Sequence, residues 1–163
     1  MMRKLLFIIV LIIYSCSESN NEYEYIVKDQ DFRTEVLINN SGNYIELENG
    51  YTYFEEANQD SVTGTVVLVH GFSVPSYILE TTFNSIKNKG FRVIMMDLYG
   101  RGFSDNPGLP QTDELRASQV IELLDKRGIE YASFVGLSNG GRIISKIAYP
   151  VSYTHLTLPT TVF

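Results

Sequence analysis

The sequence is poor in cysteine and has no concentrated positive charge. Its 163 residues include a single cysteine, Cys16, so no intramolecular disulfide bond can form. The net charge at pH 7 is -6, and no run rich in lysine and arginine is present. A nucleic acid is therefore not an expected partner, because binding phosphates requires clustered positive charge. The hydrophobic fraction of 44% suits one globular domain of modest size.

A hydrophobic run long enough to cross a membrane is also missing. The longest run covers residues 5–13, about half of the roughly 20 residues that a bilayer requires. It follows Arg3 and Lys4 and precedes a polar stretch, an order that is typical of a secretory signal peptide. We therefore expect residues 1–15 to be a signal peptide, with an uncleaved anchor or a core helix as alternatives.

The lone cysteine stands at the end of this leader. Residues 13–16, Ile-Tyr-Ser-Cys, resemble a bacterial lipobox, although Tyr14 is bulkier than the residue usually found there. The resemblance implies that Cys16 becomes a lipidated N-terminus, and its acyl chains would give a stable membrane anchor. We expect residues 16–43 to be a polar tether and the protein to lie in the bacterial cell envelope, facing the periplasm or the exterior. Ordinary signal cleavage remains an alternative.

Strand patterns begin at residue 44. Two short alternating runs, residues 44–50 and 51–58, meet at Asn49-Gly50, which predicts a β-hairpin. Three later runs are continuously apolar and predict strands that are buried on both faces. They cover residues 65–71, 91–97 and 131–138.

Helical patterns separate the three apolar strands. Apolar residues recur at helical spacing in residues 75–89, 112–127 and 139–149. Gly90 and Gly128 are suitable stops for the first two helices, and Thr112 is a suitable N-cap for the second. The order is a β-hairpin followed by β-α-β-α-β-α. It predicts the α/β class, with a parallel sheet covered by helices on both faces.

The most specific motif is Gly136-Leu137-Ser138-Asn139-Gly140. It directly follows an apolar strand and directly precedes a helix, the context in which a G-x-S-x-G motif forms a nucleophile elbow. Small residues on both sides of the serine are needed there because the turn is sharp. Ser138 is therefore our candidate catalytic nucleophile, and a serine that only caps the helix is the alternative.

The turn His70-Gly71-Phe72 ends the first apolar strand. An oxyanion is stabilised by two preorganised backbone N–H groups, and we expect these groups to come from Phe72 and Asn139. His70 could be mistaken for a catalytic base. Its position inside the turn favours a structural role, in which it holds the loop by hydrogen bonds.

The loop of residues 97–105 contains Gly100-x-Gly102 but lacks the third glycine of a dinucleotide-binding loop, since Asp105 stands at that position. A turn fixed by Asp97 and Arg101 fits this segment better. We therefore expect no bound cofactor and no metal.

Together these turns resemble the α/β-hydrolase family over residues 44–149. The resemblance is carried by the HGF turn, the D-x-x-G-R-G-x-S turn and the G-x-S-x-G elbow, in the order of the family. It implies a serine nucleophile and argues against the branches that use aspartate, such as dehalogenases and epoxide hydrolases. Residues 44–150 would then be the N-terminal half of the hydrolase domain.

His155 does not fit the role of the catalytic base. The family order is nucleophile, acid and histidine, yet none of the residues after Ser138 is Asp or Glu. Residues 151–163 also lack charge and periodicity and resemble translated sequencing adapter. We therefore expect this tail to be non-native, and the acid, the histidine and any cap domain to lie in a longer parent protein.

These observations predict a serine hydrolase that cleaves an ester, thioester or amide of a small acyl substrate through an acyl-enzyme on Ser138. The alternative is a catalytically silent binding protein of the same fold, tethered to the cell envelope. We expect the 163-residue chain itself to be inactive and unstable, because the triad is incomplete and the last strand has an open edge.

Overall fold

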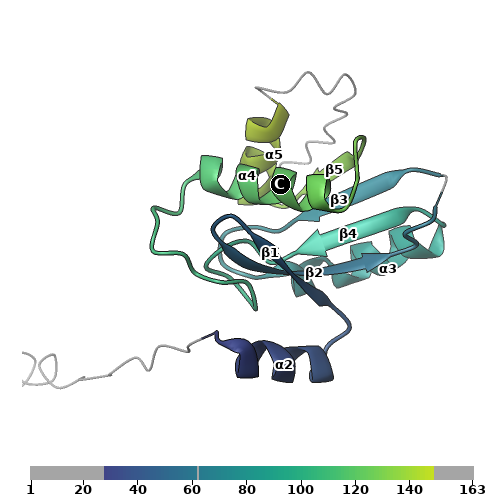
Figure 1. The fold of residues 1–163 in the computed structure, drawn as a ribbon. Coiled ribbons are helices and arrows are strands. Elements are labelled where there is room, and N and C mark those ends of the chain that lie inside the picture. Colours follow the sequence, from purple (N-terminus) through teal and green to yellow (C-terminus); the bar gives the residue numbers. More distant parts are fainter. Residues whose placement is uncertain (1–27, 62, 149–163) are drawn as a thin grey trace, which may run out of the picture.

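The computed structural model describes residues 28–61 and 63–148. Its centre is a five-stranded sheet with the strand order β1-β2-β4-β3-β5 (Figure 1). Strands β1 and β2 form an antiparallel hairpin, β2 pairs antiparallel with β4, and β3 pairs in parallel with both β4 and β5. The strand bounds are β1 Asn43–Leu47, β2 Gly50–Ala57, β3 Thr65–Val69, β4 Arg92–Met96 and β5 Ser133–Gly136.

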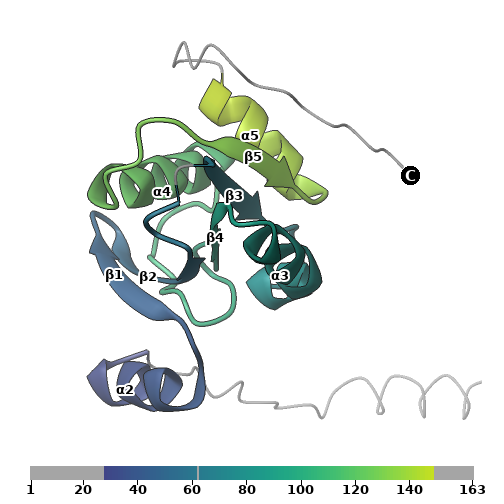
Figure 2. The same ribbon diagram turned by 90° about the vertical axis from the view of Figure 1, so that its right-hand side faces the viewer.

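Helices cover both faces of this sheet (Figure 2). On one face, a short 3₁₀ helix, η1 (Ser76–Leu79), leads into α3 (Glu80–Asn88), and Phe83 packs with Leu68 and Met95. On the other face, α4 (Asp113–Lys126) and α5 (Asn139–Ala148) lie side by side over the larger core cluster. The prediction of the α/β class with a parallel β-α-β-α-β-α unit is therefore confirmed.

The two ends of α4 were predicted correctly from single residues of the sequence. The side chain of Thr112 accepts a hydrogen bond from the backbone N–H of Leu115, as an N-cap should. Gly128 has a φ of 64°, a left-handed conformation that suits glycine after a helix. The hairpin differs slightly from the prediction. Leu47 pairs with Gly50, so the two-residue turn is Glu48-Asn49, one residue earlier than expected.

One helix was not predicted. Part of the range expected to be a polar tether, residues 16–43, forms α2 (Gln30–Asn39), which lies beside the β1–β2 hairpin (Figure 1). Only Val36 of this helix is buried, so it has no apolar stripe that would have revealed it. The tether prediction is thus wrong for residues 30–39, and residues 16–27 lie outside the described part.

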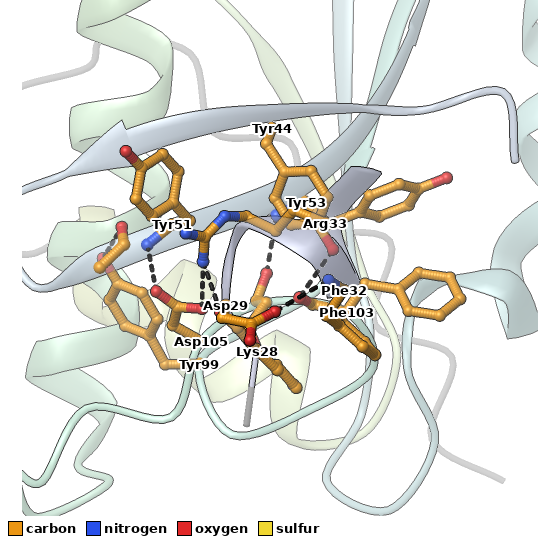
Figure 3. A network of polar contacts seen from close by, with 12 residues as sticks. Lys28, Asp29, Phe32, Arg33, Tyr44, Tyr51, Tyr53, Tyr99, Phe103 and Asp105 are labelled. Carbon is orange, nitrogen blue, oxygen red and sulfur yellow. Dashed lines mark hydrogen bonds and ion pairs between the residues drawn. The ribbon is translucent and has the colours of Figure 1, made fainter. Parts of the chain in front are cut away.

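Polar and aromatic contacts position α2 (Figure 3). The guanidinium of Arg33 lies 4.1 Å from the centroid of the Tyr51 ring and 3.6 Å from the Asp105 carboxylate. The ammonium of Lys28 donates to the backbone carbonyls of Gly102 and Ser104. Burial lowers the pKa of this lysine. Asp105 also accepts from the backbone N–H of Tyr51 at 2.8 Å. The helix therefore rests on the loop that follows β4.

Candidate active site

Ser138 lies in a tight turn between β5 and α5. Its φ is 53°, in the left-handed region that non-glycine residues rarely adopt. A Cβ atom on Gly136 would lie 2.6 Å from the carbonyl carbon of Gly140, and one on Gly140 would lie 2.2 Å from the carbonyl oxygen of Val69. Neither position can hold a side chain without moving the backbone. The turn therefore has the geometry of a nucleophile elbow, with its serine exposed.

The HGF turn lies directly against the elbow. A Cβ atom on Gly71 would lie 3.4 Å from the Cβ of Ser138 and 3.3 Å from the carbonyl oxygen of Leu137. Leu137 also donates its backbone N–H to Val69 at 3.0 Å. Among the described residues, the backbone N–H groups of Phe72 and Asn139 have no hydrogen-bond partner. The structure thus places the HGF turn against the elbow, and Phe72 and Asn139 line one cleft there.

His70 is fully buried and both of its ring nitrogens are occupied. Nε2 accepts from the backbone N–H of Leu98 at 2.9 Å, so the proton lies on Nδ1, which donates to the carbonyl oxygen of Gly71 at 2.7 Å. Burial lowers the pKa of His70 below its ordinary value. These bonds tie the HGF turn to the end of β4. A histidine held in this way is not free to act as the base for Ser138.

Asp97 organises the loop after β4. Its two carboxylate oxygens accept from the backbone N–H groups of Ser76 and Phe103, each at 2.8 Å. Gly102 has a φ of 48°, and a Cβ atom there would lie 2.0 Å from Asp97 Oδ2. Arg101 donates from Nε to the carbonyl oxygen of Phe72 at 2.5 Å. Gly100 and Gly102, both at positive φ, thus form a turn that contacts the HGF turn through Arg101. This agrees with the expectation that Asp97 and Arg101 fix the loop.

A family model described as "alpha/beta hydrolase fold" matches residues 64–149, more than half of the chain. The chain belongs to the α/β-hydrolase fold family. The segment that matches contains the HGF turn, the loop after β4 and the elbow, which are the three features that carried the resemblance in the sequence.

Individual relatives of this hydrolase segment are similar over part of their length. A 2-hydroxy-6-oxononadienedioate/2-hydroxy-6-oxononatrienedioate hydrolase of Paraburkholderia phymatum is 34% identical over 117 residues, which are 68% of this chain and 40% of that protein. An AB hydrolase superfamily protein of Bacillus subtilis is 32% identical over 103 residues, covering 63% and 37% of the two chains. The chain thus spans about two fifths of the length of these relatives.

Solved structures show the same partial coverage. An esterase from Exiguobacterium antarcticum superposes with a TM-score of 0.62 at 25% identity, covering 69% of this chain and 41% of the esterase. An epoxide hydrolase from Vigna radiata superposes with a TM-score of 0.61 at 18% identity, covering 67% and 35%. The second likeness supports the fold alone. The relatives are hydrolases with several different reactions, so the family does not by itself specify the substrate.

A cleft of about 440 Å³ opens beside the elbow of this hydrolase fold, where α4 and α5 begin. It lies next to the proposed oxyanion donors, and the sequence analysis did not identify it. The only signal in the sequence was a charged residue, Arg116, on the apolar side of α4. The residues lining the cleft are Phe72, Gln111, Thr112, Asp113, Glu114, Arg116, Asn139 and Arg142.

Gln119 is a second functional neighbour that the sequence analysis missed. It is buried in α4, donates to the carbonyl oxygen of Asp97 at 3.1 Å and accepts from the backbone N–H of Tyr99 at 2.9 Å. These bonds fix the loop after β4 to the helix that lines the cleft. A polar residue within the apolar stripe of a helix was the available signal.

Two predicted features lie outside the described residues, namely Cys16 with its leader and His155 with its tail. Within residues 28–61 and 63–148, no cluster of three or more His, Cys, Asp or Glu side chains could hold a metal ion. No helix of the described segments is long and apolar enough to span a bilayer.

Proposed function

We propose that the complete protein, meaning this chain together with the rest of its hydrolase domain, is a serine hydrolase. Its substrate is an ester, thioester or amide. The observation that carries the proposal is Ser138 in a left-handed turn, framed by glycines whose positions leave no room for a side chain. Strain of this kind is maintained where it exposes a reactive group. The likeness to an esterase and to another hydrolase of the family supports hydrolysis as the type of reaction.

In the proposed reaction, Ser138 Oγ attacks the carbonyl carbon of the substrate while a histidine from the later part of the domain takes the hydroxyl proton. The carbonyl π electrons move to oxygen, and the Phe72 and Asn139 N–H groups stabilise the resulting oxyanion. The intermediate then collapses, the histidine protonates the leaving group, and an acyl-enzyme remains. Water releases the acid by the same steps and restores Ser138.

A fluorophosphonate probe tests this role directly. We expect the probe to label Ser138 in the complete protein and to label nothing at this position in Ser138→Ala. Ser145→Ala is the matched control. Ser145 lies on α5, is exposed like Ser138, and donates only to the carbonyl oxygen of Gly141 at 2.9 Å. A folded protein that is not labelled would favour the alternative, a catalytically silent binding protein.

We also propose that the protein is exported and anchored to the membrane through a lipid on Cys16. The lipobox-like residues 13–16 after a short apolar run support this. Cys16→Ser should abolish acylation and release the protein from the membrane fraction. Unchanged fractionation of this variant would place the anchor elsewhere or indicate an uncleaved leader.

A further inference from the structure

Three buried polar atoms without a hydrogen-bond partner belong to residues of one cleft. They are Arg116 Nε, Asn139 Nδ2 and Gln111 Oε1, and all three residues line the cleft beside the elbow. Buried polar atoms in proteins are nearly always paired, since an unpaired one costs about 1–3 kcal/mol. Their convergence on one cleft therefore indicates a site that a polar ligand completes.

Arg116 is the most unusual member of this set. The residue is only 4% exposed, yet no hydrogen bond or ion pair to its side chain is found among the described residues. Burial lowers its pKa, and the nearby charge of Arg101 acts in the same direction, while the charge of Asp113 has a smaller opposite effect. A buried guanidinium normally has an anionic partner, because leaving it unpaired is costly.

The acidic residues at the rim of the cleft form no ion pair with Arg116, because each is paired with a residue of α5. The Asp113 carboxylate binds Arg142 at 2.7 Å, and the Glu114 carboxylate binds Lys146 at 2.6 Å. Both basic residues lie on α5, Arg142 near its start and Lys146 in its last turn, so these pairs hold the N-terminal end of α4 along α5. Arg101 adds a second positive charge near Arg116, and in the described structure it donates only to the carbonyl oxygens of Phe72 and Gly100 and forms no ion pair.

The helix directions reinforce this positive potential. The first residues of α4 and α5 line the cleft, and the N-terminus of a helix carries a partial positive charge. The cleft also contains Phe72 and Asn139, whose backbone N–H groups are the proposed oxyanion donors. An anionic group bound at Arg116 would therefore belong to the same molecule whose carbonyl lies at Ser138.

We propose that Arg116 binds a carboxylate of the substrate, so that the hydrolase prefers acyl groups bearing a second carboxylate over neutral acyl groups. This inference rests on the proposed function. A planar carboxylate matches the planar guanidinium, and Asn139 Nδ2 supplies a further donor. Gln111 Oε1 is an acceptor and would receive a hydrogen bond from a hydroxyl or N–H group of the substrate beside the carboxylate.

The test compares two esters of equal chain length in the complete protein. Mono-4-nitrophenyl adipate carries the second carboxylate, and 4-nitrophenyl hexanoate lacks it. We expect a higher kcat/KM for the adipate ester, after subtraction of the enzyme-free rate. Arg116→Gln should lower kcat/KM for the adipate ester by about 10- to 100-fold, the range for a hydrogen bond to a charged group, and leave the hexanoate ester nearly unchanged.

Two further variants make the result specific. Arg116→Lys keeps the charge but loses the planar fork, so it should recover part of the preference. It also serves as the variant to measure if Arg116→Gln fails to fold. Lys126→Gln removes one positive charge from the far end of the same helix, where the ammonium donates to the carbonyl oxygen of Glu46, and should keep the full preference.

Binding gives a readout that does not need turnover. Monoethyl adipate should bind to Ser138→Ala in calorimetry, and the double variant Ser138→Ala/Arg116→Gln should bind at least about 10-fold more weakly, the low end for a charged hydrogen bond. The inference would be overturned if Arg116→Gln lowered kcat/KM equally for both esters, or if Ser138→Ala and the double variant bound monoethyl adipate equally. Either result would indicate that Arg116 pairs with another part of the protein. Absence of labelling at Ser138 together with Arg116-dependent binding would instead overturn only the proposed catalysis.

Discussion

The elbow and helix α2 are held in place by opposite means. The elbow is fixed by backbone sterics, because Gly136 and Gly140 have no room for a Cβ atom and the adjacent strand β3 is buried. Helix α2 buries a single residue and is held by side-chain contacts of Lys28 and Arg33 with the loop after β4. Steric constraints leave a readable sequence motif, whereas scattered polar contacts do not. The two regions should therefore respond very differently to substitution.

The largest effect is expected at Gly140. A Cβ atom there would meet the backbone oxygen of Val69, which cannot move away without disturbing β3. Gly140→Ala should lower the free energy of unfolding by about 3 kcal/mol or more. Gly141→Ala is the matched control, since nothing lies within 4 Å of a Cβ atom at that position. It should be neutral or stabilising by about 0.5–1 kcal/mol. Urea denaturation of both variants measures this, and equal effects would contradict a steric origin.

A smaller effect is expected at His70, and it should depend on pH. Because burial lowers its folded-state pKa, the unfolded state binds more protons below about pH 6.5. The stability of the wild type should therefore be fully present above that pH and decline as the pH falls toward the folded-state pKa. His70→Gln should lower the free energy of unfolding at pH 8 by about 1–3 kcal/mol, because it leaves buried polar groups without hydrogen-bond partners.

The gap between wild type and His70→Gln should narrow as the pH falls from 8 to 5, since only the wild type loses the contribution of a neutral His70. Urea denaturation of both proteins at a series of pH values measures the gap. A gap that stays constant over this range would show that His70 does not carry the pH dependence.

Ser138→Gly should change stability in the opposite direction. The left-handed φ of 53° costs a serine roughly 1 kcal/mol that a glycine does not lose. The variant should therefore be more stable by up to about 1 kcal/mol, a gain that is reduced by the entropy that glycine loses on folding. The fluorophosphonate probe should no longer label it. Thermal unfolding next to Ser138→Ala, which keeps the strain, separates the two effects. A glycine variant no more stable than the alanine variant would argue against strain at this position.

The smallest effect on global stability is expected from a change in α2. Asp29 Oδ1 accepts from the backbone N–H of Phe32 at 2.9 Å and caps the helix. Asp29→Ala should cost about 1 kcal/mol. We expect this cost to appear as faster hydrogen exchange confined to α2, because the helix contributes little to the core. Asp31→Ala removes the same charge without the cap and should have a smaller effect. A loss of global stability would show that α2 is part of the cooperative core.

Much of the fold could be predicted because its signals are local. Strands β3 and β4 are buried, continuous apolar runs, Thr112 caps a helix, and Gly136 and Gly140 frame a serine between a strand and a helix. Each of these depends on a few neighbouring residues, so each is visible in the sequence. The same is true of His70, whose place within the turn indicated a structural role that its two hydrogen bonds agree with. The prediction of a strand buried on both faces was wrong for the third run, residues 131–138, where β5 covers only Ser133–Gly136 and only Phe134 of it is buried.

By itself, the sequence determined the order of strands and helices and the three turns around Ser138, since backbone sterics and periodic burial act over short distances. Only the tertiary structure decided that Arg116 lies unpaired beside those turns, that Gln119 holds the loop after β4, and that Lys28 and Arg33 dock α2 on it. These contacts join residues far apart in the chain. Whether a polar side chain ends up paired, buried or exposed depends on which distant segments the sheet brings to it.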